Sequence, residues 1–190
     1  NSDKIVHNMS TPFSFSFIIA ERIKKLESKH TISSSALERF NNILMGFVDV
    51  MTKSALQFHD NRKGKIITCL DFRSALKLLF YGNLMKRAND YAKINLRLWV
   101  SGKLTPLDYF FSADSIYDLV KNKIDSAIIF VDNKACVWLG FLIIYLMDEI
   151  LVRVIFTMGC SPDVLTDLCL VKIIHSDPVL KCSISRFYTF

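Results

Sequence analysis

The sequence lacks the short motifs that mark most enzymes and metal proteins. Its five cysteines form no C-x-x-C pair, and its four histidines form no H-E-x-x-H spacing. No glycine-rich phosphate loop, nucleophile–base spacing or paired-carboxylate motif stands out. We therefore expect a protein that is not an enzyme and that needs no metal, no cofactor and no small-molecule substrate.

Residues that make flexible linkers are also scarce. The 190 residues include six glycines and four prolines, and 51% of them are hydrophobic, so a packed core is expected rather than disorder. The number of cysteines is odd, and the sequence opens without the pattern of a secretory signal. Both features predict reduced thiols in an intracellular protein.

No charge-free run is long enough for a typical membrane span. The most apolar segment covers residues 135–158, but only its first 13 residues, 135–147, pass without a charge, and a span needs roughly 18–20. Asp148, Glu149 and Arg153 follow, and each would cost about 2.5–3.5 kcal/mol at the bilayer centre. A buried helix explains the segment better than a membrane span, which is the alternative.

Positive charge is concentrated in the first half of the chain. Residues 1–100 hold 16 Lys and Arg against 8 Asp and Glu, a net charge of +8, whereas residues 101–190 hold 8 against 10, a net charge of −2. This asymmetry indicates that the first half faces a polyanion. A solvated surface that happens to be basic is the alternative.

A long amphipathic helix is predicted between residues 32 and 60. Its apolar residues recur at steps of three and four and make one continuous stripe: Leu37, Phe40, Leu44, Phe47, Val48, Met51, Ala55 and Phe58. Ser33 to Ser35 offer N-caps, and Ser35 with Glu38 fits a capping box. After a basic loop, Thr68 is expected to cap a shorter helix that Gly82 ends.

Further helices are predicted on both sides of this pair. Thr11-Pro12 can start one that reaches about Leu26, and an amphipathic helix covers residues 84–99. Residues 101–106 form the best boundary in the chain, and the apolar residues 109–111 predict a packed connector after it. A short helix with Ile116, Leu119 and Val120 follows, then the apolar helix of residues 135–158, then a helix opened by Ser161-Pro162.

The first half resembles histone 2B. The order of a short helix, a long helix and a shorter helix is typical of the histone fold, and individual residues agree with core histones of type 2B: Ile32-Ser33-Ser34, Asn41, Ile67-Thr68, Ala75, Leu78-Leu79, Gly82, Leu84, Lys86 and Ala88. Residues 15–88 align with that family without a gap. The helix over residues 84–99 matches the extra C-terminal helix of histone 2B.

The second half resembles histone 2A more weakly. Val137-Trp138-Leu139, Tyr145-Leu146 and Glu149-Ile150-Leu151 match its central helix, and residues 175–180 resemble the end of its core and the turn that follows. A 2B-like half followed by a 2A-like half is similar to the histone doublets of giant DNA viruses of the Marseillevirus type, and to a shortened variant of them.

This resemblance implies an all-α chain in which two histone folds pair with each other. Residues 1–100 would form the 2B-like fold with its extra C-terminal helix, residues 101–113 a connector, and residues 114–190 the 2A-like fold. The function implied is structural: a fused dimer equivalent that wraps viral DNA in nucleosome-like particles. The alternative is a histone-fold interaction or transcription-factor module that binds or bends DNA without forming nucleosomes.

Partners and location follow from the same resemblance. The expected partners are double-stranded DNA of any sequence and a histone 4–histone 3 doublet, or histones 3 and 4, with no membrane. The expected location is inside the cell, in virion chromatin, the host nucleus or a cytoplasmic virus factory. The expected DNA contacts lie in and beside the loops between helices: Lys24, Lys25, Lys29, His30, Ser33, Ser34, Arg62, Lys63, Lys65, Thr68, Lys121, Lys123 and Lys134.

Three departures from the histone pattern affect these expectations. Gly64 stands where histone 2B has its minor-groove arginine. No Lys or Arg occurs between Arg153 and Lys172, so the second basic loop of histone 2A is missing. The family's acidic patch is reduced to Asp148, Glu149 and Asp177, because Ile144 and Val152 replace glutamates. DNA should therefore be held more weakly by the second half.

Overall fold

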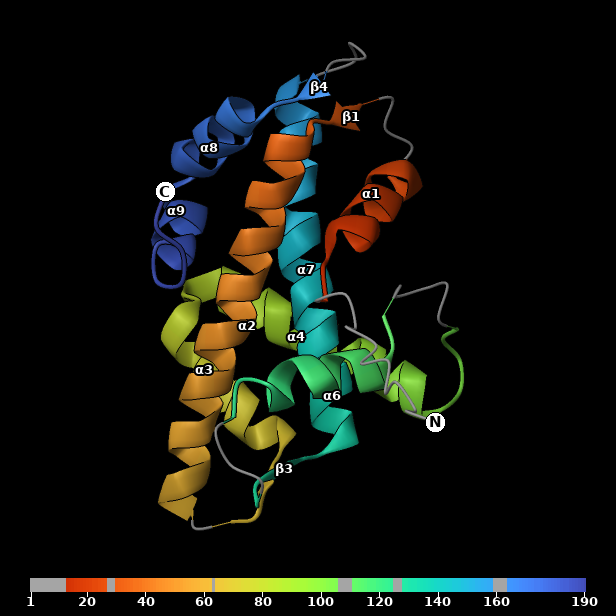
Figure 1. Ribbon diagram of the computed structural model, residues 1–190, viewed down its shortest axis with the longest axis vertical. Coiled ribbons are helices and arrows are strands. Elements are labelled where there is room, and N and C mark those ends of the chain that lie inside the picture. Colours follow the sequence, from red (N-terminus) through yellow and green to blue (C-terminus); the bar gives the residue numbers. More distant parts are fainter. Residues whose placement is uncertain (1–12, 27–29, 63, 106–110, 125–127, 159–163) are drawn as a thin grey trace, which may run out of the picture.

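The protein is helical throughout its described parts. The computed structural model describes residues 13–26, 30–62, 64–105, 111–124, 128–158 and 164–190. Within these ranges the chain forms eight α-helices and four strands of two residues each (Figure 1). The predicted all-α class is confirmed, since the strands only join helices at their ends.

The elements follow one another in an order that occurs twice. They are α1 (Ser16–Lys25), β1 (Thr31–Ile32), α2 (Ser34–Arg62), β2 (Ile66–Ile67), α3 (Cys69–Leu79), α4 (Gly82–Val100), α6 (Ala113–Lys121), β3 (Phe130–Val131), α7 (Asn133–Met158), β4 (Val164–Leu165), α8 (Asp167–Ser176) and α9 (Pro178–Ile184). Each half thus has a short helix, a strand, a long helix, a strand and a helix. One further helix, α4 or α9, follows each set.

The two halves are joined through their strands. β1 pairs in parallel with β4, so that Thr31 lies opposite Val164, and β2 pairs in parallel with β3, so that Ile66 lies opposite Phe130. The first strand of each half therefore meets the second strand of the other half. In Figure 1 the β1–β4 pair lies at one end of the long helices α2 and α7, and β3 lies at the opposite end.

Local sequence explains where the helices of the first half begin. The Oγ of Ser33 accepts the N–H of Ala36, so Ser33 is the N-cap of α2, and the predicted Ser35–Glu38 capping box is wrong because the helix has already begun at Ser34. Thr68 caps α3 as predicted, and it does so in a capping box with Asp71.

Two helix boundaries differ from the prediction. α3 ends at Leu79, and Gly82 begins α4 instead of ending α3, because its positive φ of 51° makes the turn between the two helices. α8 begins at Asp167 with Thr166 as N-cap, since Val164–Leu165 pair with β1 and cannot be helical. The predicted starts at Thr11-Pro12 and Ser161-Pro162 lie outside the described residues.

The core forms around α7. This helix contacts α1, α2, α3, α4, α6 and α8, and its residues 135–147 are all buried. By length and composition α7 is the one helix in the described chain that could cross a membrane, but 83% of its most apolar window is buried inside the fold. Burial by six neighbouring helices favours the interpretation of a core helix over a membrane span.

The stripe predicted for α2 packs against this core. Phe40, Leu44, Phe47, Val48, Met51 and Ala55 are fully buried, as predicted. The connector before α6 approaches α7 closely at Gly140, where an added Cβ would lie 2.3 Å from the ring of Phe111. Phe111 is buried, which agrees with a packed connector, whereas residues 106–110 lie outside the described chain.

Separating the two halves should expose this core. Because α7 supplies the surface on which α1, α2, α3 and α4 pack, residues 1–100 alone should not form a stable monomer, and mixing them with residues 101–190 should restore a helical one-to-one complex. Circular dichroism and sedimentation measure both outcomes. A cooperative, monomeric fold of residues 1–100 alone would contradict this interpretation.

Candidate nucleic-acid interface

The first candidate site is the β2–β3 end, which we define by the described residues Arg62, Lys65, Thr68, Lys121, Lys123 and Lys134. The strand pairing brings most of them together from both halves: the N–H of Phe130 donates to the carbonyl of Lys65 at 3.0 Å, and Lys134 lies in the first turn of α7, directly after β3. Lys123 lies farther along α2, beside Asp49. Lys63 of the same loop lies outside the described residues.

Two lysines of the β2–β3 end are available to an anion. Lys65 and Lys134 are exposed, and no ion pair is recorded for either within the described chain. Arg62 is committed instead, because it binds Asp71 within the capping box of α3. Lys121 donates to the carbonyl of Ile129 at 2.6 Å, and Lys123 lies 3.6 Å from Asp49.

The second candidate site is the β1–β4 end, with Lys24, Lys25, His30, Ser33 and Ser34. Lys24 is exposed and pairs with Glu21 at 2.6 Å, and Lys25 is also exposed. Two of the predicted contacts are less favourable here, because His30 is buried and the N–H of Ser33 donates to the carbonyl of Leu165 at 3.0 Å. Lys29 lies outside the described residues. Ser34, at the start of α2, remains exposed.

The charged side chain that follows β4 is a carboxylate and not a cation. Asp167, the first residue of α8, binds Arg39 of α2, with 2.9 Å between Nη2 and Oδ2. Thr166 uses its Oγ1 to cap α8 at the N–H of Cys169. The absence of Lys and Arg between Arg153 and Lys172 thus leaves the β1–β4 end less basic than the β2–β3 end.

The three carboxylates expected to form an acidic patch are all bound to arginines. Asp148 on α7 accepts two hydrogen bonds from Arg22 on α1, one of them 2.9 Å long. Glu149 is bound by Arg153 and lies 3.5 Å from Arg87. Asp177 accepts a hydrogen bond of 2.6 Å from Nε of Arg153, and it also caps α9. The surface predicted as an acidic-patch remnant is therefore largely neutralised.

The pKa values of these groups follow from burial and pairing. Burial raises the pKa of Asp148 even though Arg22 acts in the opposite direction. Burial alone would also raise the pKa of Glu149 and Asp177, but hydrogen bonds and the charge of Arg153 outweigh it and lower both. Glu149 and Asp177 are therefore ionised near neutral pH and held by the same arginine.

A cleft of about 760 Å³ lies over these ion pairs. Its lining mixes the paired charges with the tyrosines Tyr91 and Tyr145 and with two exposed apolar side chains of α7, Val152 and Phe156. All three carboxylates of this cleft are already paired with arginines. A partner that binds by inserting its own arginine would therefore find no unpaired carboxylate among them. The cleft therefore does not present the free negative charge that was predicted for an acidic patch.

Two of the cysteines are buried or half-buried beside the β2–β3 pair. Burial raises the pKa of Cys69 to about 11 and that of Cys136 to about 12, so both remain uncharged thiols near neutral pH. Within the described ranges, no group of three His, Cys, Asp or Glu side chains could hold a metal ion.

Sequence reasoning missed the arginine partners and one basic surface. Arg22 and Asp148 are 126 residues apart, and no local pattern in the sequence signals such a pair. The cations of α4 were visible as polar positions of an amphipathic helix, but they received no role. Their spacing of seven and four residues, from Lys86 to Lys93 and Arg97, places them on one helix face and was the available signal.

Replacing Arg153 should change how stability depends on pH. A carboxylate with a lowered pKa stabilises the fold above its unfolded pKa, near 4.5 for Glu149 and 3.8 for Asp177, and loses this contribution as pH falls through its folded value. Arg153→Gln should therefore cost about 2 kcal/mol near pH 7, and the difference from wild type should shrink below pH 4.

Denaturant unfolding at several pH values measures this difference. Arg97→Gln is the matched control, because Arg97 is exposed and no ion pair is recorded for it within the described residues. It should change stability by no more than about 0.5 kcal/mol at any pH. A gap between Arg153→Gln and wild type that stayed constant from pH 7 to pH 3 would refute the assignment.

Comparison with known proteins leaves the function open. No protein-family model matches the chain, and a comparison with curated proteins gives no significant match. The candidate interface therefore stands on its geometry and on the residues that resemble histones 2B and 2A.

Proposed function

We propose that this chain is a fused equivalent of a histone 2B–histone 2A dimer that packages double-stranded DNA. In this proposal each half is a histone fold, and the two folds pair within one chain. Support comes from the element order that occurs twice and from the crossed strand pairs, in which each first strand meets the second strand of the other half. The resemblance of residues 15–88 to histone 2B points the same way.

The β2–β3 end is the observation that carries the proposal. Paired loops from two halves present Lys65 and Lys134, both exposed, on one end of the helical body. Histone octamers bind DNA by this mode, through backbone contacts and without base-specific ones. Binding should accordingly depend on phosphate charge and be nearly independent of sequence.

The proposal includes a partner and a location. A fused 2B–2A chain would supply the 2B-type and 2A-type folds of a nucleosome-like particle, so a histone 4–histone 3 doublet, or histones 3 and 4, would supply the others. Viral chromatin is the expected setting, in the virion, the host nucleus or a cytoplasmic virus factory. We also propose that the chain has no enzymatic role, in keeping with the raised thiol pKa values of Cys69 and Cys136.

One observation favours the alternative of an interaction or transcription-factor module. Asp148, Glu149 and Asp177 are all paired with arginines, so the chain offers little of the acidic surface on which partners of nucleosomes dock. A module that binds or bends DNA outside nucleosomes would not need that surface. Reconstitution with histone partners separates the two functions.

Charge reversal at the β2–β3 end should weaken binding to every duplex alike. The double variant Lys65→Glu/Lys134→Glu removes two phosphate contacts, so affinity should fall about tenfold and the slope of log K against log salt should decrease by about 2. Arg62 is left unchanged, because its loss would uncap α3. Fluorescence anisotropy on two duplexes of unrelated sequence measures both quantities.

The matched control is Lys172→Glu/Lys181→Glu, which changes net charge equally on α8 and α9 at exposed positions. It should retain most of the affinity. Equal loss in both variants would mean that net charge alone drives binding, and strong preference for one short sequence would support a transcription factor.

The missing basic loop should shorten the DNA that a reconstituted particle protects. The β1–β4 end combines Asp167 on one side with few free cations on the other, so DNA next to it should be held loosely. After assembly with histones 3 and 4, nuclease digestion should leave a fragment shorter than the roughly 146 bp of a standard particle. A full-length protected fragment would show that the loop is dispensable, and no protected fragment at all would favour the interaction module.

A further inference from the structure

A second basic surface lies on α3 and α4, the two helices that follow β2, and most of it lies on α4. We call it the α3–α4 basic surface, and its cations all lie on the solvent side of these helices: Arg73, Lys77, Lys86, Arg87, Lys93 and Arg97. Among the exposed residues of α3 and α4, only Asp90 carries a negative charge. None of these cations belongs to the candidate interface described above.

Helix geometry arranges these charges in a row. The opposite face of α4, with Leu84, Ala88 and Ala92, is buried, and α4 packs on α7. Lys86 and Arg97 are eleven residues apart, which places them about 16 Å apart along the helix axis. The row is therefore far longer than a single phosphate group.

The turn at Gly82 extends the row onto α3. Its positive φ of 51° lets the chain reverse between the two helices, and a cleft of about 360 Å³ opens between them. Arg73 and Lys77 of α3 and Lys86 of α4 line this cleft together with uncharged residues, and no carboxylate lines it. Three cations from two helices thus converge without a counter-ion of their own.

Five of these six cations have no ion pair within the described fold. Within the described residues, Arg87 is the one member of the set with a recorded ion pair, to Glu149 at 3.5 Å. By contrast, Arg22, Arg39 and Arg153 each bind a carboxylate with short hydrogen bonds. Mutual repulsion among unpaired cations destabilises a fold slightly, so the surface is better explained by an external anion than by internal stability.

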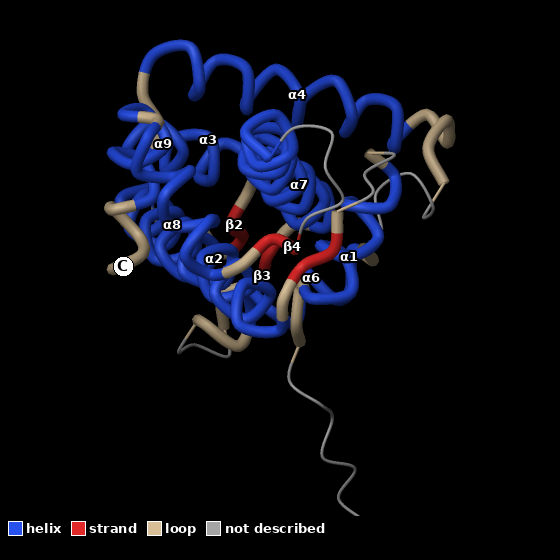
Figure 2. The backbone as a smooth tube through the Cα atoms, turned by 90° about the horizontal axis from the view of Figure 1, so that it is seen from above, coloured by secondary structure: helices blue, strands red, loops and turns tan. Residues whose placement is uncertain are grey.

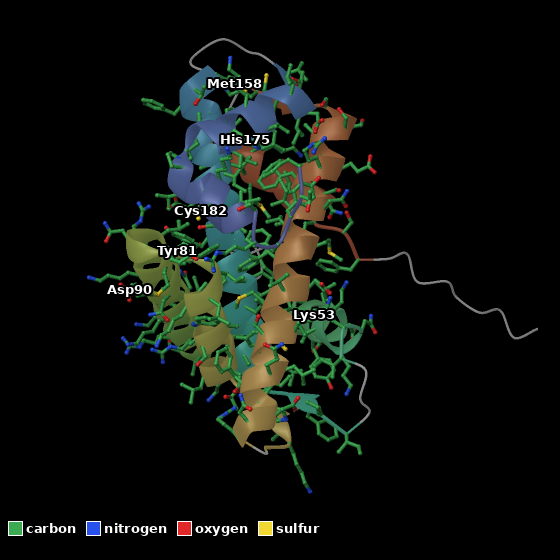
Figure 3. All side chains as sticks on the ribbon, turned by 90° about the vertical axis from the view of Figure 1, so that its left-hand side faces the viewer. Lys53, Tyr81, Asp90, Met158, His175 and Cys182 are labelled. Atoms are coloured by element: carbon green, nitrogen blue, oxygen red, sulfur yellow. The ribbon has the colours of Figure 1, made fainter. Side chains whose placement is uncertain are left out.

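The surface faces a different direction from the strand pairs. Seen from above in Figure 2, α4 lies across one side of α7, and both strand pairs lie on the other side of α7. In Figure 3, nitrogen atoms of side chains gather along the helix that carries Asp90, well away from the strands. A straight duplex held at the β2–β3 end would not also follow α4.

We propose that the α3–α4 basic surface binds a second DNA duplex, so that one molecule bridges two DNA segments. This inference rests on the proposed DNA-binding function and extends it. A duplex strand carries one charge per 3.4 Å, so the row on α4 faces about five phosphates. A protein partner would be expected to find a cluster of aromatic or apolar anchors, whereas the exposed apolar side chains of this surface are spread along both helices and the turn between them: Leu70, Leu78, Tyr81, Ile94 and Val100.

Bridging is measured with two duplexes of unrelated sequence. The first is fixed to beads and saturated with the full chain, the beads are washed, and a fluorescent second duplex is added. The wild-type chain should capture the second duplex in a salt-sensitive manner. Lys77→Glu/Lys86→Glu and Lys93→Glu/Arg97→Glu should each lower capture several-fold, and the combined variant should lower it about tenfold or more.

Controls separate this inference from the proposed function. Each variant should still bind the first duplex and melt like wild type, since all four side chains are exposed, and Lys172→Glu/Lys181→Glu should bridge normally. Sedimentation should show a monomer, which excludes bridging by self-association. Failure of the wild type to bind the first duplex would overturn the proposed function itself.

Three results would overturn the inference while leaving DNA binding intact. The first is a wild-type chain that binds the first duplex but captures no second one. The second is capture by the combined variant at the wild-type level. The third is that the surface variants lose binding to polyglutamate but keep bridging, which would assign the surface to an acidic protein.

Discussion

The whole structure depends on burying α7 on every side. Residues 135–147 carry no charge and have no polar face, so this helix is stable in water only when other helices surround it. Six helices do so, and four of them, α1 to α4, come from the first half of the chain. The second half therefore cannot complete its core alone. The helices that cover α7 belong to the same chain, so they are present wherever α7 is.

The same packing fixes where the charges lie. Once α2 and α7 are packed within one core, the loops at their ends have to meet, and the short strand pairs β1–β4 and β2–β3 record those meetings. Buried or half-buried arginines then clamp the halves together: Arg22 binds Asp148, and Arg39 binds Asp167. Replacing one partner of such a pair would leave the other charge without its counter-ion in a partly dehydrated environment, which lowers the stability of the fold. These two arginines belong to the fold and are not free to bind DNA.

The sequence predicted the parts of this structure that local rules control. The stripe on α2 from Phe40 to Ala55 and the cap at Thr68 follow from periodicity and side-chain chemistry, and both are confirmed. The start predicted for α8, at Ser161-Pro162, was wrong. Val164 and Leu165 form a strand because they pair with β1, which lies more than 130 positions earlier in the chain. The neutralised acidic patch was not predictable either, since the arginines that bind Asp148 and Glu149 come partly from α1 and α4. Contacts of this range carry no periodic signal.

The charge of the first half illustrates the same limit in another form. Its net charge of +8 suggested one polyanion-binding face, yet the structure divides its cations into three groups. Among the described cations of this half, Arg22, Arg39, Lys53 and Arg62 are paired within the fold. Lys24, Lys25 and Lys65 lie near the strand pairs, and the others lie on α3 and α4: Arg73, Lys77, Lys86, Arg87, Lys93 and Arg97. A lysine or arginine that is already paired within the protein is less available to neutralise a phosphate and release the counterions condensed on DNA. If the chain binds DNA as proposed, the number of unpaired cations on each face, rather than the net charge, should therefore determine how strongly that face binds.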